Sequence, residues 1–168
     1  MNAPARKTAP AALDPALFLK LDRFLADYAH ALDDGMTDEW PACFTQDGVY
    51  QVTTRENLES GYPIGIVLCE GRGMMEDRML ALKVANIYEP HVFCHIVGRP
   101  DIREESPGVY AARSNFSVFR TMQRGDAELF ATGKYLDRIV LEDGEPRFAA
   151  RRVILDSRCI DILLVYPL

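Results

Sequence analysis

The sequence contains few of the residues and motifs that metal, redox and nucleophilic sites need. It has four cysteines and three histidines in 168 residues, and no two cysteines form a Cys-x-x-Cys pair. It also lacks a Gly-x-Ser-x-Gly nucleophile motif, a glycine-rich phosphate loop and a His-Glu-x-x-His zinc motif. These absences argue against the common serine hydrolases, nucleotide-binding enzymes and zinc proteases.

Long apolar runs and an excess of basic residues are also missing. No apolar run approaches the roughly 20 residues of a membrane helix, and the net charge of -6 argues against nucleic acid as a partner. Pro4 and Pro10 interrupt the start of the chain, which has no apolar signal core, so we predict a disordered lead over residues 1–13. Scattered cysteines without an export signal indicate reduced thiols and a cytoplasmic location.

Helical signals are concentrated in the first half of the chain. Asp14 followed by Pro15 is typical of a helix start, and the apolar stripe that follows predicts a helix ending at Gly35. A short helix is expected from Thr37, and a third helix over residues 74–85, where apolar residues recur at helical spacing.

Alternating patterns dominate the rest of the chain and predict an antiparallel sheet. The expected strands cover residues 49–53, 64–68, 91–97, 110–118, 129–141 and 148–155, with a polar turn region over 99–108. Helices first and long strands last indicate an α+β class. We predict that residues 14–168 form a single domain, a curved antiparallel sheet wrapped around the N-terminal helices as a cone with an apolar interior.

The end of the sequence is nearly uncharged. Residues 160–168 contain a single charged side chain, Asp161, and no further segment follows that could cover them. We therefore expect this apolar tail to need a neighbouring polypeptide. The alternative is that the tail is the last strand of the chain's own core.

Few titratable residues suggest a catalytic site. His91 and His95 lie four apart in an extended segment, so both are expected on one strand face. They fit a structural or interface role, a pocket acid–base role or a metal pair. One enzyme-like alternative pairs Tyr50 with His91 or His95 inside the cone. The acidic residues that end the first helix, Asp33 and Asp34, are predicted to be solvated.

Several stretches, in this order, resemble one protein family. The chain is similar to the small (beta) subunit of aromatic-ring-hydroxylating dioxygenases, the oxygenase components of Rieske non-haem iron systems. The stretches are residues 39–50, 55–57, 77–78, 91–98, 113–120, 128–137 and 151–157. Within the family, residues 65–68, 85–91, 156–157 and 166–168 look most like subunits of terephthalate dioxygenase and salicylate 5-hydroxylase.

The resemblance implies a cone-shaped NTF2-like (cystatin-like) fold and a non-catalytic role. In such enzymes an alpha subunit holds the Rieske [2Fe-2S] cluster and the mononuclear iron, and an NADH-dependent system supplies electrons. This chain lacks the Cys-x-His and Cys-x-x-His pairs of a Rieske site. The implied assembly is an α3β3 hexamer with a beta trimer. No catalytic, cofactor or metal residue is then expected in this chain.

Two other functions stay open at this point. The first is a stand-alone isomerase or dehydratase of the same fold, with a His/Tyr/Asp pocket built from Tyr50, His91 and His95. The second is a ligand-binding or dimerising module with no enzyme attached.

Overall fold

The computed structural model describes residues 13–63, 65–84, 89–157, 164 and 166–168. The predicted disordered lead lies outside the described residues except for Leu13, which packs against the hydrophobic core. The lead and the domain boundary after it therefore stay predictions.

The first helix forms as its capping and periodicity predict. Helix α1 spans Pro15–Asp33, and the Asp14 carboxylate accepts a hydrogen bond from the Leu17 N–H at 3.0 Å. Gly35 follows the helix with φ 74°, which a residue with a side chain rarely adopts. The buried face of α1 includes Leu21, Leu25, Tyr28, Ala29 and Leu32.

Three shorter helices follow. The expected second helix is a single turn of 3-10 helix, η1 (Trp40–Cys43), whose Trp40 is buried. Helix α2 (Arg55–Glu59) lies in the polar connection after the first strand, and the Thr54 hydroxyl caps it by accepting from the Asn57 N–H. Helix α3 spans Arg72–Val84 and buries Met75, Met79 and Leu82.

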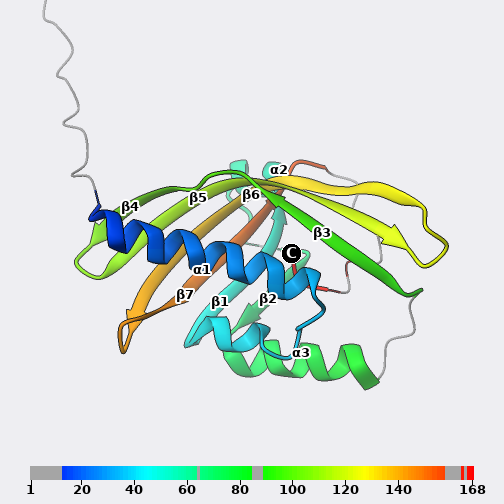
Figure 1. Cartoon of the computed structure of the whole chain (residues 1–168), viewed down its shortest axis with the longest axis horizontal. Coiled ribbons are helices and arrows are strands. Elements are labelled where there is room, and N and C mark those ends of the chain that lie inside the picture. Colours follow the sequence, from blue (N-terminus) through cyan, green and yellow to red (C-terminus); the bar gives the residue numbers. More distant parts are fainter. Residues whose placement is uncertain (1–12, 64, 85–88, 158–163, 165) are drawn as a thin grey trace, which may run out of the picture.

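Among the described residues, seven strands form one curved sheet (Figure 1). They are β1 (Phe44–Thr54), β2 (Val67–Glu70), β3 (His91–Val97), β4 (Asp101–Ser106), β5 (Val109–Met122), β6 (Ala127–Glu142) and β7 (Glu145–Leu155). The order is β2-β1-β7-β6-β5-β3, and β4 pairs with the other half of β5. All pairs are antiparallel except β1 with β7, which is parallel.

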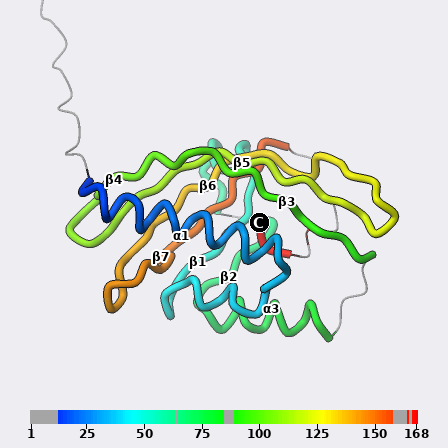
Figure 2. Tube along the Cα trace, viewed as in Figure 1, coloured from blue at the N-terminus to red at the C-terminus, as the bar shows by residue number. Residues whose placement is uncertain are grey.

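The helices and the sheet enclose a single core. Helix α1 lies across the strands and packs against β3 and β7, whereas α3 packs against β1 and β2 (Figures 1 and 2). In Figure 1 the end of the chain, marked C, lies close to the C-terminal part of α1, and Leu168 bonds to Tyr28 of α1 and Tyr50 of β1. This is the α+β cone that the sequence predicts.

Two strand predictions were wrong. The predicted polar turn region over residues 99–108 contains strand β4, which forms a hairpin with β5; five of its six residues are exposed, and a solvated strand can be mostly polar. The alternation over residues 129–141 also predicts Leu129 on the same face as Ala131. The register shift between Val118 and Phe119 instead places Leu129 opposite Phe119, on the outer face.

Candidate functional site

The interior of the cone contains a buried ion pair. Asp137 of β6 and Arg151 of β7 are cross-strand partners, with Oδ1 and Nε 3.6 Å apart and side chains that are 0% and 2% exposed. In the sequence, Asp137 interrupts the apolar face of its strand. The register of β6 against β7 explains the interruption, because it places a cation directly opposite the carboxylate.

Aromatic rings surround the Arg151 guanidinium. Its Cζ lies 4.0 Å from the ring centroid of Tyr28, 3.9 Å from that of Tyr135 and 4.7 Å from that of Phe148. Such contacts stabilise a cation that has left water. Burial opposes the charge of Arg151, but Asp137 and the nearby phenols outweigh it, and the pKa of Arg151 is raised. Arg151 is therefore a fixed positive charge in the core.

The acidic groups around Arg151 titrate at unusual values. Burial raises the pKa of Asp137 to about 6, although Arg151 opposes the shift, and burial raises the pKa of Tyr50 to about 12. The pKa values of Tyr28 and Tyr135 are also raised by burial. At neutral pH the phenols are protonated, so they can donate hydrogen bonds but cannot act as bases.

Several polar atoms of this cluster have no hydrogen-bond partner among the described residues. They are both carboxylate oxygens of Asp137, Nε and Nη1 of Arg151 and the hydroxyl of Tyr135. Buried polar atoms are usually hydrogen-bonded. Here the Asp137–Arg151 ion pair and the contacts of Arg151 with aromatic rings replace those hydrogen bonds.

The described end of the chain lies inside the cone, not on its surface. Leu168 is 0% exposed, and its N–H donates to the Tyr50 hydroxyl at 2.9 Å. Its carbonyl accepts from the Tyr28 hydroxyl at 3.2 Å. The expectation that the apolar tail needs a neighbour is therefore wrong for Leu168, which belongs to the chain's own core. Residues 160–163 and 165 lie outside the described residues.

A histidine–carboxylate pair joins α1 to β3. The His95 Nδ1 lies 2.6 Å from Asp33 Oδ1, and the Asp33 carboxylate also accepts the His95 backbone N–H at 2.9 Å. The side chain of His95 is 0% exposed, and its Nε2 has no hydrogen-bond partner among the described residues. The prediction that Asp33 is a solvated helix end was wrong, since sequence position does not reveal that β3 passes this helix end.

His91 has different neighbours. It shares the inward face of β3 with His95, as predicted, and the Phe93 ring lies between them, 5.0 Å from the ring of His91 and 6.2 Å from that of His95. The Nδ1 of His91 lies 2.8 Å from the Glu89 carbonyl oxygen, and its ring contacts Tyr166 at 5.4 Å. A hollow of about 130 Å³ opens beside it, between the end of α1 and the start of β3.

The three residues of the enzyme-like alternative are thus bound to separate partners. Tyr50 bonds to Leu168, His95 to Asp33 and His91 to the Glu89 carbonyl. In the part of the chain that the structure describes, no three His, Cys, Asp or Glu side chains gather closely enough to hold a metal ion.

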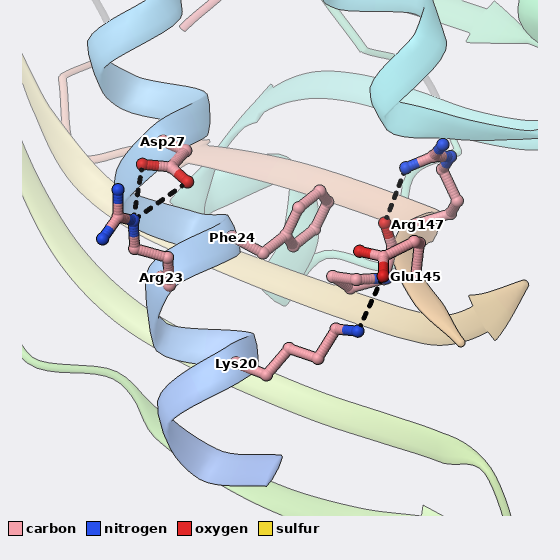
Figure 3. Close-up of a pocket in the computed structure, with 7 residues that line it drawn as sticks. Lys20, Arg23, Phe24, Asp27, Glu145 and Arg147 are labelled. Atoms are coloured by element: carbon pink, nitrogen blue, oxygen red, sulfur yellow. Dashed lines mark hydrogen bonds and ion pairs between the residues drawn. The ribbon is translucent and has the colours of Figure 1, made fainter. Parts of the chain in front are cut away.

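A second hollow lies where α1 meets the β6–β7 hairpin (Figure 3). Its volume is about 200 Å³, and four of its five charged lining residues form pairs, Lys20 with Glu145 at 2.9 Å and Arg23 with Asp27 at 3.1 Å, while Arg147 donates to the Pro146 carbonyl. Phe24 points from α1 toward the sheet between these pairs (Figure 3) and packs on Phe148 with ring centroids 4.6 Å apart. We therefore interpret this hollow as a solvated gap between α1 and the β6–β7 hairpin.

The outer face of the sheet carries exposed apolar side chains at its β3 edge. We call them the β3 patch: Val92 and Ile96 on β3, Phe119 on β5 and Leu129 on β6. They are 60%, 57%, 38% and 56% exposed, respectively. Phe119 is the direct cross-strand partner of both Cys94 and Leu129, so the patch runs across three adjacent strands. Contiguous apolar surfaces of this kind commonly mark protein–protein contacts.

No helix in the described residues is long and apolar enough to cross a membrane.

Comparisons with known proteins agree on one family. A family model described as ring hydroxylating beta subunit matches residues 28–162. The chain is 38% identical over 150 residues to subunit beta 2 of the terephthalate 1,2-dioxygenase terminal oxygenase component of a Comamonas species, covering 89% of this chain and 97% of that protein. It is 35% identical over 141 residues to the anthranilate 1,2-dioxygenase small subunit of Burkholderia cepacia, covering 84% and 88%.

A solved structure extends this likeness to three dimensions. The crystal structure of a protein described as the beta subunit of an aromatic-ring-hydroxylating dioxygenase from Novosphingobium aromaticivorans matches with a TM-score of 0.83 at 35% identity. The match covers 91% of this chain and 97% of that one. It confirms the cone-shaped NTF2-like fold.

Proposed function

The chain belongs to the ring-hydroxylating beta subunit family, and from this premise we propose that it is a non-catalytic subunit of a terminal oxygenase acting on an aromatic carboxylate. Its role is to assemble and stabilise the catalytic alpha subunit. The curated relatives are named for terephthalate and anthranilate, both of which carry a carboxylate on the aromatic ring. That shared group supports the proposed substrate class.

The β3 patch is the observation that carries this proposal. Its four apolar side chains lie on strands, where their positions are fixed before a partner arrives. A partner that covers them gains hydrophobic free energy without ordering a loop. The interior, by contrast, is filled by the chain's own residues, so binding at the surface is the better-supported role.

The proposed division of labour assigns the redox chemistry to the alpha subunit. That subunit would hold the Rieske [2Fe-2S] cluster and the mononuclear iron of an NADH-dependent system in the cytoplasm. A Rieske cluster needs two cysteine and two histidine ligands in paired motifs, and this sequence contains no such pair. The proposed assembly is an α3β3 hexamer built on a beta trimer.

The test is co-purification of the two subunits with a matched pair of variants. Phe119→Asp places a charge in the β3 patch, whereas Ala111→Asp places it on the same strand and the same face, eight residues and about 27 Å away. We expect Phe119→Asp to lower the affinity for the alpha subunit about thirtyfold or more, and Ala111→Asp to leave this affinity unchanged. Equal assembly by both variants would exclude the β3 patch as the docking surface.

The stand-alone isomerase or dehydratase remains as a second candidate because of the Asp33–His95 pair. A carboxylate that orients a buried histidine is a common arrangement for general-base catalysis. The test is turnover of small carbonyl substrates by the isolated chain and by His95→Gln. We expect no turnover from either. Activity that is lost in His95→Gln would favour the second candidate over the proposed role.

A further inference from the structure

The cone encloses a residue that is held in the way a ligand is held. We propose that the interior is a binding site for a small molecule that carries an N–H and a carbonyl on either side of a branched aliphatic side chain, as one residue of a peptide does, and that Leu168 of the chain occupies this site. The inference goes beyond the proposed subunit role, since it concerns the inside of the cone and not its outer face.

The main-chain N–H and carbonyl of Leu168 are both bound by phenol hydroxyls. The Tyr50 hydroxyl accepts from the Leu168 N–H at 2.9 Å and donates to its carbonyl at 3.4 Å. The Tyr28 hydroxyl donates to the same carbonyl at 3.2 Å and accepts from Trp40 Nε1 at 2.9 Å. Each hydroxyl uses its single proton on the carbonyl and a lone pair on a donor. The two phenols thus match the donor and the acceptor that flank the side chain of one residue.

The side chains that form the site come from separate and well-packed elements. Tyr28 lies on α1, Trp40 on η1 and Tyr50 on β1, and all three side chains are at most 3% exposed. The Trp40 and Tyr50 rings pack edge to face with centroids 4.9 Å apart. Packing of this kind fixes the hydroxyl positions without any contribution from the tail, which is what a preformed site requires.

The main chain of Leu168 is bonded differently from that of an ordinary core residue. Buried backbone groups usually pair with backbone groups of a helix or a sheet. Among the described residues, the hydrogen bonds of Leu168 run to side-chain hydroxyls only. A neighbouring tail residue, Leu164, is likewise held by a side chain, with its carbonyl accepting from Arg78 Nη2 at 3.1 Å.

The Arg151 cluster places a positive charge next to the site. The Arg151 guanidinium lies on the Tyr28 ring, and its Nε and Nη1 are buried without a hydrogen-bond partner among the described residues. A fixed positive charge near the Tyr28 hydroxyl makes that hydroxyl a better donor to a carbonyl oxygen. The site should therefore favour an occupant that has a strong hydrogen-bond acceptor next to an apolar group.

The test displaces Leu168 and supplies its chemistry from outside. Leu168→Asp places a carboxylate where Leu168 is fully buried, so we expect the altered residue to leave the interior. The probe is the peptide acetyl-Tyr-Pro-Leu-amide, which repeats residues 166–168. Trp40 is the only tryptophan in the chain and bonds to Tyr28, so its fluorescence reports occupation of the site.

Leu19→Asp is the matched control, because it makes the same substitution at a side chain that is 66% exposed on α1. The peptide should return the Trp40 emission of Leu168→Asp to that of the wild type. It should bind this variant at least about tenfold more tightly than it binds the wild type or Leu19→Asp, in which Leu168 competes. A further Tyr50→Phe change in the Leu168→Asp background should weaken the peptide about fivefold.

A milder variant keeps the inference open to failure. Leu168→Gly retains the main-chain N–H and carbonyl and loses only the side chain, so it should fold and also bind the peptide more tightly than the wild type does. Two outcomes would overturn the inference: folded Leu168→Asp and Leu168→Gly that both fail to bind the peptide, or both variants unfolding, which would show that the site does not exist without Leu168. The peptide acetyl-Tyr-Pro-Asp-amide should not bind to any variant.

Discussion

The inner and outer faces of the same sheet use their side chains in opposite ways. On the inner face, Arg151 and Asp137 pair with each other, and the Tyr50 hydroxyl binds Leu168. On the outer face, the β3 patch leaves apolar side chains in water. In this chain the interior of the cone is therefore filled by its own residues, whereas the apolar side chains that a partner could cover lie on the outer face.

The largest expected effect comes from removing the interior cation. Arg151→Met leaves the Asp137 carboxylate buried without its partner and should destabilise the chain by about 3–5 kcal/mol in urea unfolding at pH 7.5. Arg152→Met is the control, because its neighbouring side chain is exposed on the outer face and should cost less than about 0.5 kcal/mol. Similar losses for the two variants would show that the interior pair is not stabilising.

A second effect follows from the pKa of Asp137, which is raised to about 6 in the folded chain against about 3.9 when unfolded. Well below pH 4 the carboxyl is protonated in both states and does not affect stability. As the pH rises to about 6, the unfolded chain ionises first, so stability falls by up to about 3 kcal/mol. Urea unfolding between pH 4 and pH 7 should show this fall.

The control for this pH dependence is Asp137→Asn, which cannot ionise at that position. The fall in stability should be smaller in this variant by the Asp137 contribution. If the two proteins have parallel pH profiles, then Asp137 does not titrate as described.

Part of this account could be predicted from the sequence, and part could not. The cap at Asp14, the end of α1 at Gly35 and the bounds of β3 follow from local signals, and the structure confirms them. The Arg151–Asp137 pair depends on the register of two strands, and Asp33 meets His95 from 62 residues away. Neither contact leaves a local signal beyond a lone charge on an apolar strand.

The tail shows why composition alone misleads. An apolar ending is compatible with both a partner's surface and the chain's own interior, because hydrophobicity has no direction. The hydroxyls of Tyr28 and Tyr50 decide between them. In the sequence, Tyr28 looked like an ordinary core position, and Tyr50 was considered only as a partner of His91 or His95 in a catalytic alternative. The β3 patch was missed for a related reason, since the bulge that turns Leu129 outward is not visible in the sequence pattern.

A smaller effect is expected at the Asp33–His95 pair. Asp33→Asn keeps the size of the side chain but weakens its bonds to the His95 ring and backbone N–H, and should cost about 1–2 kcal/mol. Asp34→Asn alters the adjacent, exposed carboxylate and should be nearly neutral. Urea unfolding of the two variants measures the difference, and equal stabilities would mean that the pair does not tie α1 to β3.

The central claim is that this chain supplies binding surface and not chemistry. Its most direct test is native mass spectrometry of the chain co-expressed with its alpha subunit, together with oxygenation of an aromatic carboxylate by the isolated chain and by the complex. The account predicts equal numbers of the two subunits in one complex, with turnover only when the alpha subunit is present. Two results would contradict it: a chain that stays monomeric although the alpha subunit is co-expressed, or an isolated chain that oxygenates the substrate alone.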